Sequence, residues 1–457
     1  MPRTVTDQPA AERELPAGLI SLDELRNAVK REQIAIVMPA VPDMMGRLQG
    51  KRIAARHFLD RVDSGSAASE ACAYILATDV DMAPLDRFEL TGWKDGFQDI
   101  GVVADLDTIR VLPYLPGTAL VHCDAVYRDN VAVEVAPRRM LQRQLARLGE
   151  LGLEIRVGLE SEFVLCRGEE PVSSHNLDYS LNHPPAMADF FRDLEEALDR
   201  SGTPAEAVKT EGAAGQIEVT FPYGPALPAC DSYTVYKHAT KHLAERRSMV
   251  ATFMAAPFTG VGSGLHLHLS LWRDGEPVFA TRAGEAPPET MLHAIGGLIA
   301  GLPHLAPLYA PHVNSYRRYA TSHAFAPQRM NWGHDNRGCA VRVTGHGEGT
   351  HLEVRLPGAD ANPYLVVTAA CAAIVHGLTH QLTPTEPTVG DPYADREAPP
   401  VHRDLTEALA HFERNDFAEN ALGADLVRHY AHAAHAEVDF HRREVTDVDR
   451  RRGFDRA

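Results

Sequence analysis

The chain has 457 residues, of which 44% are hydrophobic and 23% are charged, as in a soluble globular protein with two or three domains. Its formal net charge of -17 argues against nucleic acid and against an anionic membrane as partners. The sequence shows no signal peptide, no apolar run near the ~20 residues that span a membrane, and no C-x-x-C pair among its six cysteines. We therefore expect a cytoplasmic protein with reduced thiols.

The first third of the chain predicts a tail followed by a small α+β domain. Residues 1–18 are polar and contain three prolines, which is typical of a flexible tail. A capping box at Ser21 opens a helix over residues 22–31, and the apolar run 34–41 indicates a strand. Short strand-like pieces follow, so we place the small domain at residues 19–128.

Longer helices alternate with strands in the rest of the chain, which predicts a second, larger α+β domain over residues 129–457. Helical periodicity marks the segments 138–151, 187–200, 233–249, 289–308, 363–382 and 405–443.

Four strand-like segments of the larger domain concentrate Glu and His on one face. Side chains two residues apart on a strand point the same way. The same-face polar positions are Glu160 with Glu162, Gln216 with Glu218, His266 with His268, and His351 with Glu353. Such carboxylates repel one another, and a bound divalent cation is the simplest agent that stabilises them. One segment alone is more often an ordinary amphipathic strand, but four together predict a sheet lined with Mg²⁺ or Mn²⁺.

Five arginines lie close to these strands in the sequence. Guanidinium groups beside Mg²⁺-type ligands suggest clamps for phosphate and carboxylate groups, although arginine is also a common surface residue. They are Arg317, Arg318, Arg337, Arg342 and Arg355. The sequence contains no Walker A motif, which excludes a conventional P-loop.

Six segments, in order along the larger domain, resemble the glutamine synthetase family. They are GLESEF (158–163), EGAAGQIE (211–218), GSGLHLHLS (262–270), NSYRR (314–318), DNRGCAVR (335–342) and LEVRLPGADANPYL (352–365). The region from Trp93 to residue 130 is similar to the end of that family's small domain. The resemblance implies an N-terminal β-grasp domain and a catalytic domain with a curved antiparallel sheet flanked by helices.

The resemblance also implies the cofactors and their ligands. ATP and two to three Mg²⁺ or Mn²⁺ ions are expected. The first metal would be held by Glu162, Glu211 and Glu218, and the second by Glu160, His266 and Glu353. Arg337 and Arg342 resemble the phosphate clamps, with Arg337 also catalytic. The residues on the nucleotide side would be His268 and Ser270 and, by looser matches, Glu206 and Tyr223.

The substrate side follows from the same motifs. Gly262, Arg318 and Arg355 resemble residues that hold glutamate, and Tyr179 resembles a tyrosine of the amine pocket. In the implied reaction the carboxylate attacks the γ-phosphate of ATP, and an amine displaces phosphate from γ-glutamyl phosphate. Glu211 and Asp79 would hold the amine and accept its proton.

Three positions depart from the family pattern. The ammonia-using enzymes carry an Asp-Gly-Ser-Ser latch, whereas residues 75–82 read ILATDVDM, with Asp79 in place of the Asp and no serines. Phe325 stands where the family's flap has a catalytic Glu, and His351 replaces a nucleotide-side arginine. Two of these changes affect the ammonium pocket while the metal and glutamate positions are intact. The pattern predicts a glutamate–amine ligase acting on ethanolamine, another small alkylamine or a polyamine.

Other interpretations remain open at this point. They are an ammonia-using glutamine synthetase, a non-catalytic structural or sensor relative, and a related fold such as a guanidino kinase or a glutamate–cysteine ligase. The resemblance further implies a large ring-shaped homo-oligomer, a dodecamer, in which Asp79 lies near a neighbour's Glu211. Tyr393 falls near a position that some family members adenylylate, but an ordinary exposed loop tyrosine is the simpler interpretation.

Overall fold

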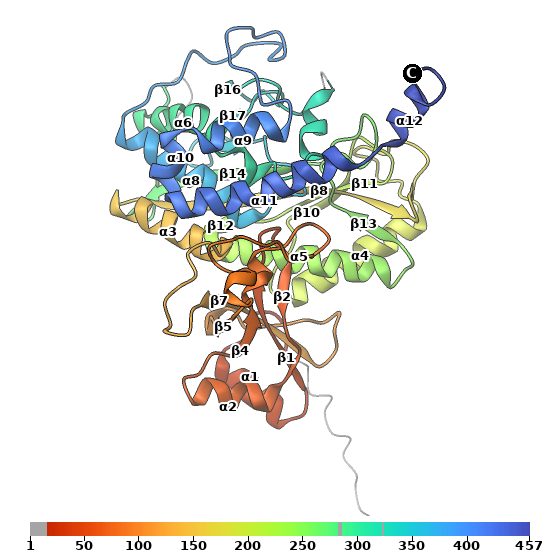
Figure 1. Cartoon of the computed structure of the whole chain (residues 1–457), viewed down its shortest axis with the longest axis vertical. Coiled ribbons are helices and arrows are strands. Elements are labelled where there is room, and N and C mark those ends of the chain that lie inside the picture. The colour runs from red at the N-terminus through yellow and green to blue at the C-terminus, as the bar shows by residue number, and fades with distance from the viewer. Residues whose placement is uncertain (1–15, 282–285, 322–323) are drawn as a thin grey trace, which may run out of the picture.

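The computed structural model describes residues 16–281, 286–321 and 324–457. All but the last three residues of the predicted tail 1–18 lie outside this range. The described chain forms two regions, each built on its own sheet (Figure 1). The N-terminal region, red to orange, lies below the much larger C-terminal region, which confirms the predicted α+β architecture.

The small N-terminal sheet has the strand order β2-β1-β7-β5-β4. Its strands are β1 (Ile36–Pro42), β2 (Leu48–Gly50), β4 (Ser69–Cys72), β5 (Asp99–Ala104) and β7 (Thr118–Val126), with β3 (Ile53–Ala54) and β6 (Arg110–Val111) paired at its sides. Strands β1 and β7 are parallel, and the other pairs are antiparallel. Two helices accompany this sheet, α1 (Leu22–Lys30) and α2 (Ala55–Asp63). The capping box of Ser21 and Glu24 is formed, which explains where α1 begins.

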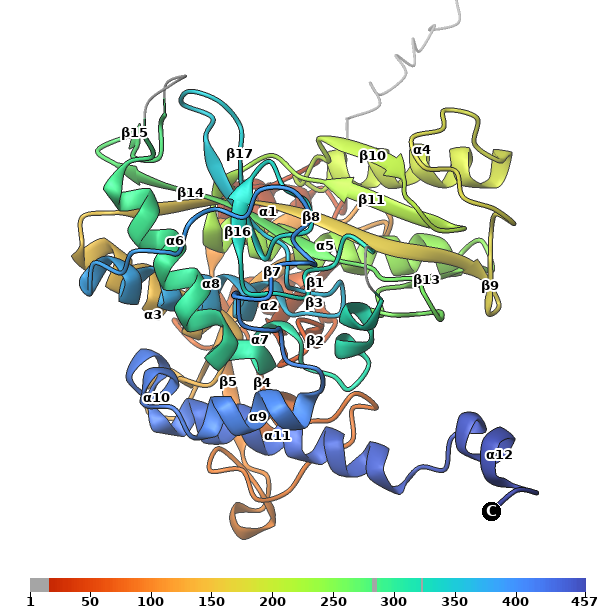
Figure 2. The same cartoon turned by 90° about the horizontal axis from the view of Figure 1, so that it is seen from above.

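The large sheet has the strand order β10-β11-β8-β14-β18-β17-β16. These strands are β8 (Glu154–Arg167), β10 (Ala207–Thr210), β11 (Gln216–Thr220), β14 (Leu265–Arg273), β16 (Trp332–His334), β17 (Val341–Thr344) and β18 (His351–Val354). Short strands β9 (Glu170–Pro171), β12 (Gly224–Pro225), β13 (Val250–Thr252) and β15 (Glu276–Pro277) pair at its margins. All pairs are antiparallel except β16 with β17. Seen from above, β8 and β14 run the length of this region (Figure 2).

Helices pack against the apolar face of the large sheet. They include α3 (Pro137–Glu150), α4 (Pro185–Arg200), α5 (Ala226–Glu245), α6 (Glu289–Gly301), α7 (Ala306–Tyr309) and α8 (Pro363–Thr379). Ile155, Val157, Leu159 and Phe163 of β8 are buried in the core that these helices complete. The polar face of β8, which carries Glu160 and Glu162, therefore points to the other side of the sheet.

Three of the helix predictions differ from the structure. The helix predicted at 233–249 begins at Ala226 and ends at Glu245. The segment 289–308 is interrupted by a 3-10 turn at Leu302–Leu305, because Pro303 and Pro307 cannot donate the backbone hydrogen bonds of a continuous helix. The segment 405–443 forms three helices, α9 (Leu405–Glu413), α10 (Asp416–Leu422) and α11 (Ala424–Arg443), followed by α12 (Asp447–Gly453).

The expectation that no segment is long and apolar enough to span a membrane also needs correction. The stretch Glu289–Tyr309 meets both criteria by length and composition. However, 67% of the most apolar 18 residues of this stretch is buried inside the protein, where the segment packs against α8 and the sheet. A core helix of this kind is a weak indication of a membrane span.

A buried arginine joins the two regions. Arg138 of α3 is 2% exposed, and its Nε lies 3.1 Å from Asp231 of α5. Its Nη1 and Nη2 donate to Asp124 at 2.8 Å and Asp105 at 2.5 Å, both in the N-terminal region. Because a buried charge is tolerated only when it is paired, this cluster holds the small sheet against the large one.

Candidate functional site

The register of the large sheet brings the polar residues into cross-strand pairs. Glu218 of β11 lies opposite Glu162 of β8, and His266 of β14 lies opposite Glu160. On the far side of β14, His268 lies opposite Glu353 of β18. Directly paired side chains are about 5 Å apart at their Cβ atoms, so the alternation seen in each sequence segment becomes one continuous acidic and imidazole surface.

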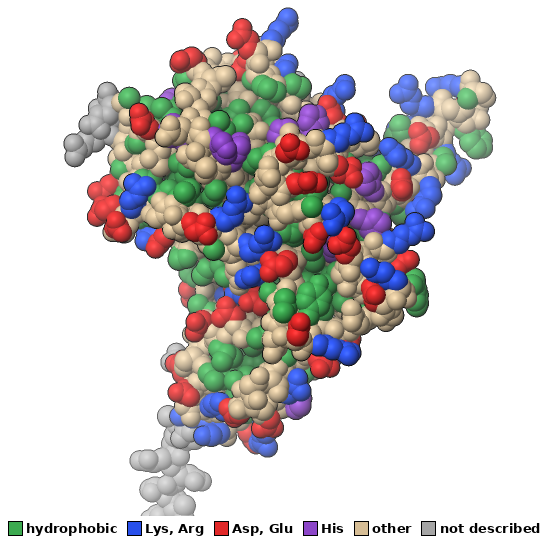
Figure 3. Space-filling model, turned by 60° about the vertical axis from the view of Figure 1, so that its left-hand side comes forward, with side chains coloured by type: hydrophobic (Ala, Val, Ile, Leu, Met, Phe, Trp, Pro, Cys, Tyr) green, Lys and Arg blue, Asp and Glu red, His purple; other side chains and the backbone are tan. Residues whose placement is uncertain are grey.

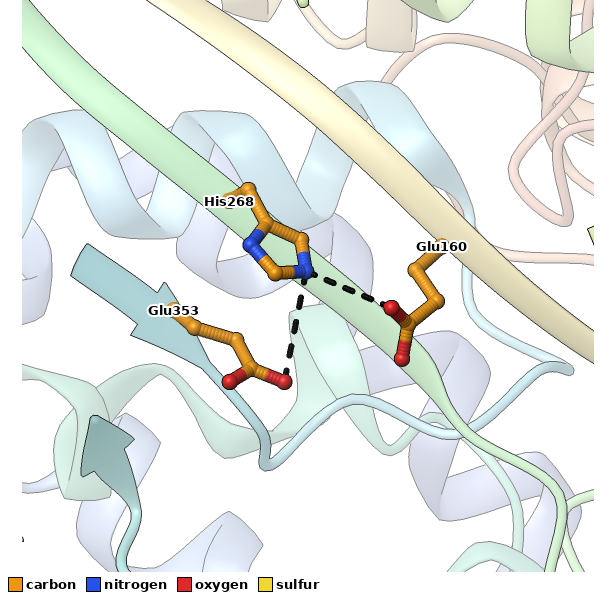
Figure 4. A group of neighbouring side chains, drawn as sticks. All are labelled: Glu160, His268 and Glu353. Carbon is orange, nitrogen blue, oxygen red and sulfur yellow. Dashed lines mark ion pairs between the residues drawn. The ribbon is translucent and has the colours of Figure 1, made fainter. Parts of the chain in front are cut away.

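One end of this surface offers a three-residue group suited to a metal ion. Glu160, His268 and Glu353 converge from β8, β14 and β18 (Figure 4). Their ligand atoms lie within 4.8 Å of one another, with His268 Nε2 3.5 Å from Glu160 and 4.0 Å from Glu353. His266, the imidazole expected here, is closer still, because its Nδ1 lies 2.6 Å from Glu160 and 3.7 Å from Glu353. Both histidines therefore face these carboxylates.

The orientation of His268 follows from a chain of hydrogen bonds. His351 Nδ1 lies 2.7 Å from the carbonyl oxygen of Gly349 and can only donate to it. Its Nε2 is then left as an acceptor for His268 Nδ1 at 3.0 Å. When His268 is neutral, that arrangement leaves a lone pair on its Nε2, on the side of Glu160 and Glu353. His351, which replaces an arginine of the resemblance, thus orients His268 so that its Nε2 could bind a cation.

The other end of the surface is a second acidic group formed by Glu162, Glu211 and Glu218. Glu162 is 9% exposed and Glu218 is 7% exposed. Burial raises the pKa of Glu162. Burial, and then the nearby Glu160 and Glu211 carboxylates, raise the pKa of Glu218 to about 10. Burial also opposes ionisation of Glu211, but hydrogen bonds from Lys209 and Glu218 hold its pKa below the ordinary value.

The donor set fits divalent cations. Four carboxylates and two imidazoles lie on one face of the sheet, and Glu211 lies just beyond the end of β10 beside Glu218. Two of the carboxyl groups have raised pKa values because no sufficient positive charge offsets their burial. A bound cation would supply that charge. Mainly oxygen ligands with a minority of nitrogen are typical of Mg²⁺ and Mn²⁺ sites. The number of ions remains a prediction.

Three of the predicted arginines are buried beside this surface. Arg342 Nη1 donates to Glu353 at 2.9 Å, and Arg355 pairs with the other oxygen of Glu353. Burial opposes ionisation of Glu353, but Arg355 and then His266 outweigh it and hold its pKa at about 2. Arg355 Nε is buried without a hydrogen-bond partner among the residues described, which leaves a donor for a substrate carboxylate.

Arg318 is held differently, by backbone carbonyl groups. Its Nη1 donates to the carbonyl oxygens of Arg355 and Leu356 at 3.2 and 3.1 Å. Gly262 lies so close that a Cβ there would be 3.0 Å from Arg318 Cγ, so a larger residue would displace the arginine side chain by a few tenths of an ångström. The structure therefore brings Gly262, Arg318 and Arg355 together, whereas Arg317 and Arg337 are exposed.

A cavity of about 430 Å³ opens next to the Glu160 group. All four residues predicted on the nucleotide side line it: Glu206, Tyr223, His268 and Ser270. Arg156 and Trp272 are among the lining residues that were not predicted. The Arg156 guanidinium lies 3.8 Å from the ring centroid of Trp272. The Tyr223 ring is nearly parallel to the Trp272 ring, and their centroids are 6.4 Å apart. Flat aromatic and guanidinium surfaces of this kind suit a purine base.

The residues predicted to surround the amine are more exposed, or lie farther from the carboxylates, than the predicted metal ligands are. Tyr179 and Phe325 are 70% and 66% exposed, both with left-handed backbone. The neighbouring flap residue His323 lies outside the described residues. Asp79 accepts a hydrogen bond from the Ala83 amide and lines a small cavity with residues of α11, away from the metal-ligand groups. Tyr393, expected to be exposed, is half-buried against Gly338.

Lys209 and Gln216 are site residues whose roles the sequence did not reveal. Lys209 pairs with Glu218 in the sheet and bonds to Glu211. Gln216 Nε2 donates to Glu162 and to the Gly262 carbonyl, both at 2.9 Å, and so ties a metal-ligand candidate to the glycine loop. In the sequence, only their spacing could have pointed to the site. Lys209 is two residues before Glu211, and Gln216 is two residues before Glu218.

Comparison with known proteins agrees with this geometry. The glutamine synthetase catalytic domain matches residues 134–453. A gamma-glutamylethanolamide synthetase of Streptomyces coelicolor is 39% identical, covering 98% of both chains. A glutamate–isopropylamine ligase of a Pseudomonas species is 30% identical, covering 89% of this chain and 92% of the relative. A gamma-glutamylputrescine synthetase of Escherichia coli is 31% identical over 89% of each.

The fold comparison extends over nearly the whole chain. The solved structure of GmaS in complex with ADP superposes with a TM-score of 0.82 at 27% identity, covering 94% of this chain and 99% of the other. The matched catalytic domain contains every predicted metal ligand, the arginine series and the cavity. This chain is therefore a ligase of the glutamine synthetase family.

Proposed function

We propose that this protein joins the γ-carboxylate of glutamate to a primary organic amine, in preference to ammonia, through γ-glutamyl phosphate. The observation that carries the proposal is Phe325, which replaces the acid of the flap while the metal and glutamate positions are intact. The named amides of the relatives, formed from ethanolamine, isopropylamine and putrescine, support the same class of substrate.

Different residues would bind ATP, glutamate and the transferring phosphoryl group. The cavity beside His268 would receive ATP, with its base on Trp272 and its phosphates directed toward Glu160 and Glu353. Arg355 and Arg318 would hold glutamate, and Arg342 and Arg337 would stabilise the charge on the transferring phosphoryl group. Bound divalent cations would neutralise the phosphates and orient the attacking carboxylate.

The last step requires a neutral amine. Glu211 is ionised and only 23% exposed in its side chain, so it can hold an ammonium group and accept its proton. Phe325 can do neither, but its ring can pack against methylene groups. Burying one CH₂ group contributes about 0.8 kcal/mol, so a two-carbon amine gains on the order of tenfold over ammonia.

The test compares kcat/KM for ammonium with kcat/KM for ethanolamine, isopropylamine and putrescine, measured as phosphate release with ATP and glutamate. We expect a small organic amine to exceed ammonium by about tenfold or more. Phe325→Glu should narrow or reverse that preference, because it restores an acid to the flap, whereas the matched Phe325→Leu should keep it. A wild-type enzyme that uses ammonium best would show instead an ammonia-using glutamine synthetase.

A further inference from the structure

The turn at residues 312–315 leads into the 3-10 helix Ser315–Ala320, which carries Arg318. Two hydrogen bonds between its end residues close this turn. The Ser315 amide donates to the His312 carbonyl at 3.0 Å, and the His312 amide donates to Ser315 Oγ at 3.0 Å. Ser315 is 1% exposed and Arg318 is 6% exposed. The position of this turn therefore sets where the buried Arg318 side chain starts.

Two side chains of the turn fasten it to segments of the substrate site. Asn314 exchanges two hydrogen bonds of 3.0 Å with the backbone of Ala256, on the loop that leads to Gly262. Ser315 Oγ donates to Asp360 Oδ2 at 2.6 Å, in the segment that follows β18. The turn and the glycine loop thus belong to one hydrogen-bonded frame.

A further attachment of the turn comes from outside the site, from Glu437 of α11. The Val313 amide donates to Glu437 Oε1 at 3.2 Å, and His312 Nδ1 lies 3.7 Å from the same oxygen. The Glu437 side chain is 15% exposed. Burial opposes its ionisation, but the neighbouring His312, the Val313 amide and His441 outweigh burial and hold the pKa of Glu437 below its ordinary value. An ionised carboxylate accepts a stronger hydrogen bond than a neutral group does.

Helix α11 is itself held in place, so Glu437 is a fixed point for the turn. Tyr430 Oη donates to the Val135 carbonyl at 3.0 Å, and His429 Nε2 donates to the Leu76 carbonyl at 2.8 Å. The buried apolar side chains of α11 pack in the main core. A shift of the turn away from Glu437 would therefore not be followed by the helix.

We propose that Glu437 is a positioning residue for glutamate binding, because it fixes the turn 312–315 and so holds Arg318 where it can contact a glutamate carboxylate. This inference rests on the proposed function, since it takes Arg318 as a ligand of glutamate. Without the Glu437 carboxylate, the turn loses its attachment to α11 and the start of the Arg318 side chain can shift. A misplacement of about 1 Å at such a contact weakens it by about tenfold or more.

Three variants test this role through the split between KM and kcat. Glu437→Ala should raise the KM for glutamate about tenfold, while the KM for ATP and kcat at saturating glutamate stay within about twofold of wild type. Glu437→Gln should restore most of the glutamate affinity, because its side-chain oxygen can still accept from the Val313 amide. Glu413→Ala is the matched control. It removes a carboxylate that lies 3.0 Å from His435 of α11 and does not touch the turn, so it should behave as wild type.

Phosphate release gives the kinetic constants, and calorimetry of the full-length enzyme with L-glutamate gives the affinity directly. Glu437→Asp keeps the test decisive if Glu437→Ala does not fold. It draws the carboxylate back from the turn by one methylene group and should raise the KM for glutamate by about threefold. An unchanged KM for glutamate in Glu437→Ala, or in Glu437→Asp where the alanine variant does not fold, would overturn the proposal. So would an equal rise in the KM for ATP.

Failure of the proposed function is a separate result. Every assay is run at a saturating concentration of the best nitrogen donor, whether that is an organic amine or ammonium. If ammonium proves the best donor, the proposed amine preference is wrong, and the KM for glutamate still reports whether Glu437 positions Arg318.

Discussion

Glu218 is a buried acid among other acids, and its protonation couples stability to metal binding. The folded-state pKa of about 10 lies above the ordinary value of 4.5. The Glu218 carboxyl group therefore loses its proton at a lower pH in the unfolded chain than in the folded chain. The stability contributed by this group is complete below about pH 4.5 and is lost as the pH rises toward 10. A cation at Glu162, Glu211 and Glu218 would reverse this by favouring the ionised form.

Metal binding should accordingly release protons and protect the enzyme more strongly at higher pH. We expect the Tm of the metal-free protein to fall between about pH 6 and pH 9, and Mg²⁺ or Mn²⁺ to restore it. Glu218→Gln should weaken this pH dependence and the gain in Tm with metal, and turnover should be lost while the circular dichroism spectrum is retained. The exposed Glu196→Gln is the control. Calorimetry in buffers of different ionisation enthalpy measures the protons, and full activity in excess chelator would contradict the prediction.

For single residues, the sequence predicted which side chains face the site better than it predicted which residues they contact. Glu160, Glu162 and Glu218 fall on the polar face as expected, because strand alternation depends only on local geometry. The roles of Lys209 and His351 depend on register with β11 and β14, which one strand alone does not reveal.

Helices α6 and α8 meet with their backbones in direct contact. A Cβ on Gly297 would lie 2.2 Å from the Ala373 carbonyl oxygen, and one on Gly377 would lie 2.1 Å from the His293 carbonyl oxygen. Rigid backbone atoms cannot move away as a flexible side chain would. These glycines therefore set the distance between two helices that pack in the main core.

Gly297→Ala should separate α6 from α8 and lower the free energy of unfolding by about 3 kcal/mol. Gly149→Ala in α3 is the matched control, because nothing lies within 4 Å of its added Cβ. That control should be neutral or stabilise by up to about 1 kcal/mol, since alanine has the higher helix propensity. Denaturant unfolding of the two variants measures the difference, and equal stabilities would show that the helices adapt.

The periodicity of residues located the helices but not their breaks. The 289–308 and 405–443 patterns are continuous in hydrophobicity, yet the chain turns at Leu302–Leu305 and again at Gly423, whose φ is 101°. Proline and glycine mark these points in the sequence. Whether such a residue bends a helix or ends it depends on the packing around it.

At the scale of the molecule, two features of the described residues are a mixed-charge face and a projecting C-terminal arm, residues 444–457. Acidic and basic side chains are interspersed across the face shown in Figure 3, so the net charge is not gathered there into a single patch. Helix α12 extends away from the body in Figures 1 and 2 and has no buried residues. The arm exposes three large apolar side chains, Val445 at 71%, Val448 at 50% and Phe454 at 80%.

Exposed apolar groups on a projecting helix would suit a contact with another subunit, and we propose that they make one in the predicted ring homo-oligomer. Asp79 points to the same conclusion, because within its own chain it lines a cavity apart from the acidic groups and would need a neighbour's Glu211 to take part in the reaction. We expect native mass spectrometry to show a closed ring assembly, with a dodecamer as the specific prediction.

The triple variant Val445→Ser, Val448→Ser and Phe454→Ser should shift this assembly to smaller species, because it removes the apolar surface of the arm while leaving every core residue in place. The specific activity of the triple variant should be lower than that of wild type. On dilution it should also fall more steeply than the activity of wild type does. Arg451→Gln with Arg452→Gln on the same helix is the control, since these two exposed arginines carry charge, whereas Arg450 lies over the Phe454 ring. A monomeric wild type that is fully active at high dilution would refute both the assembly and the shared site.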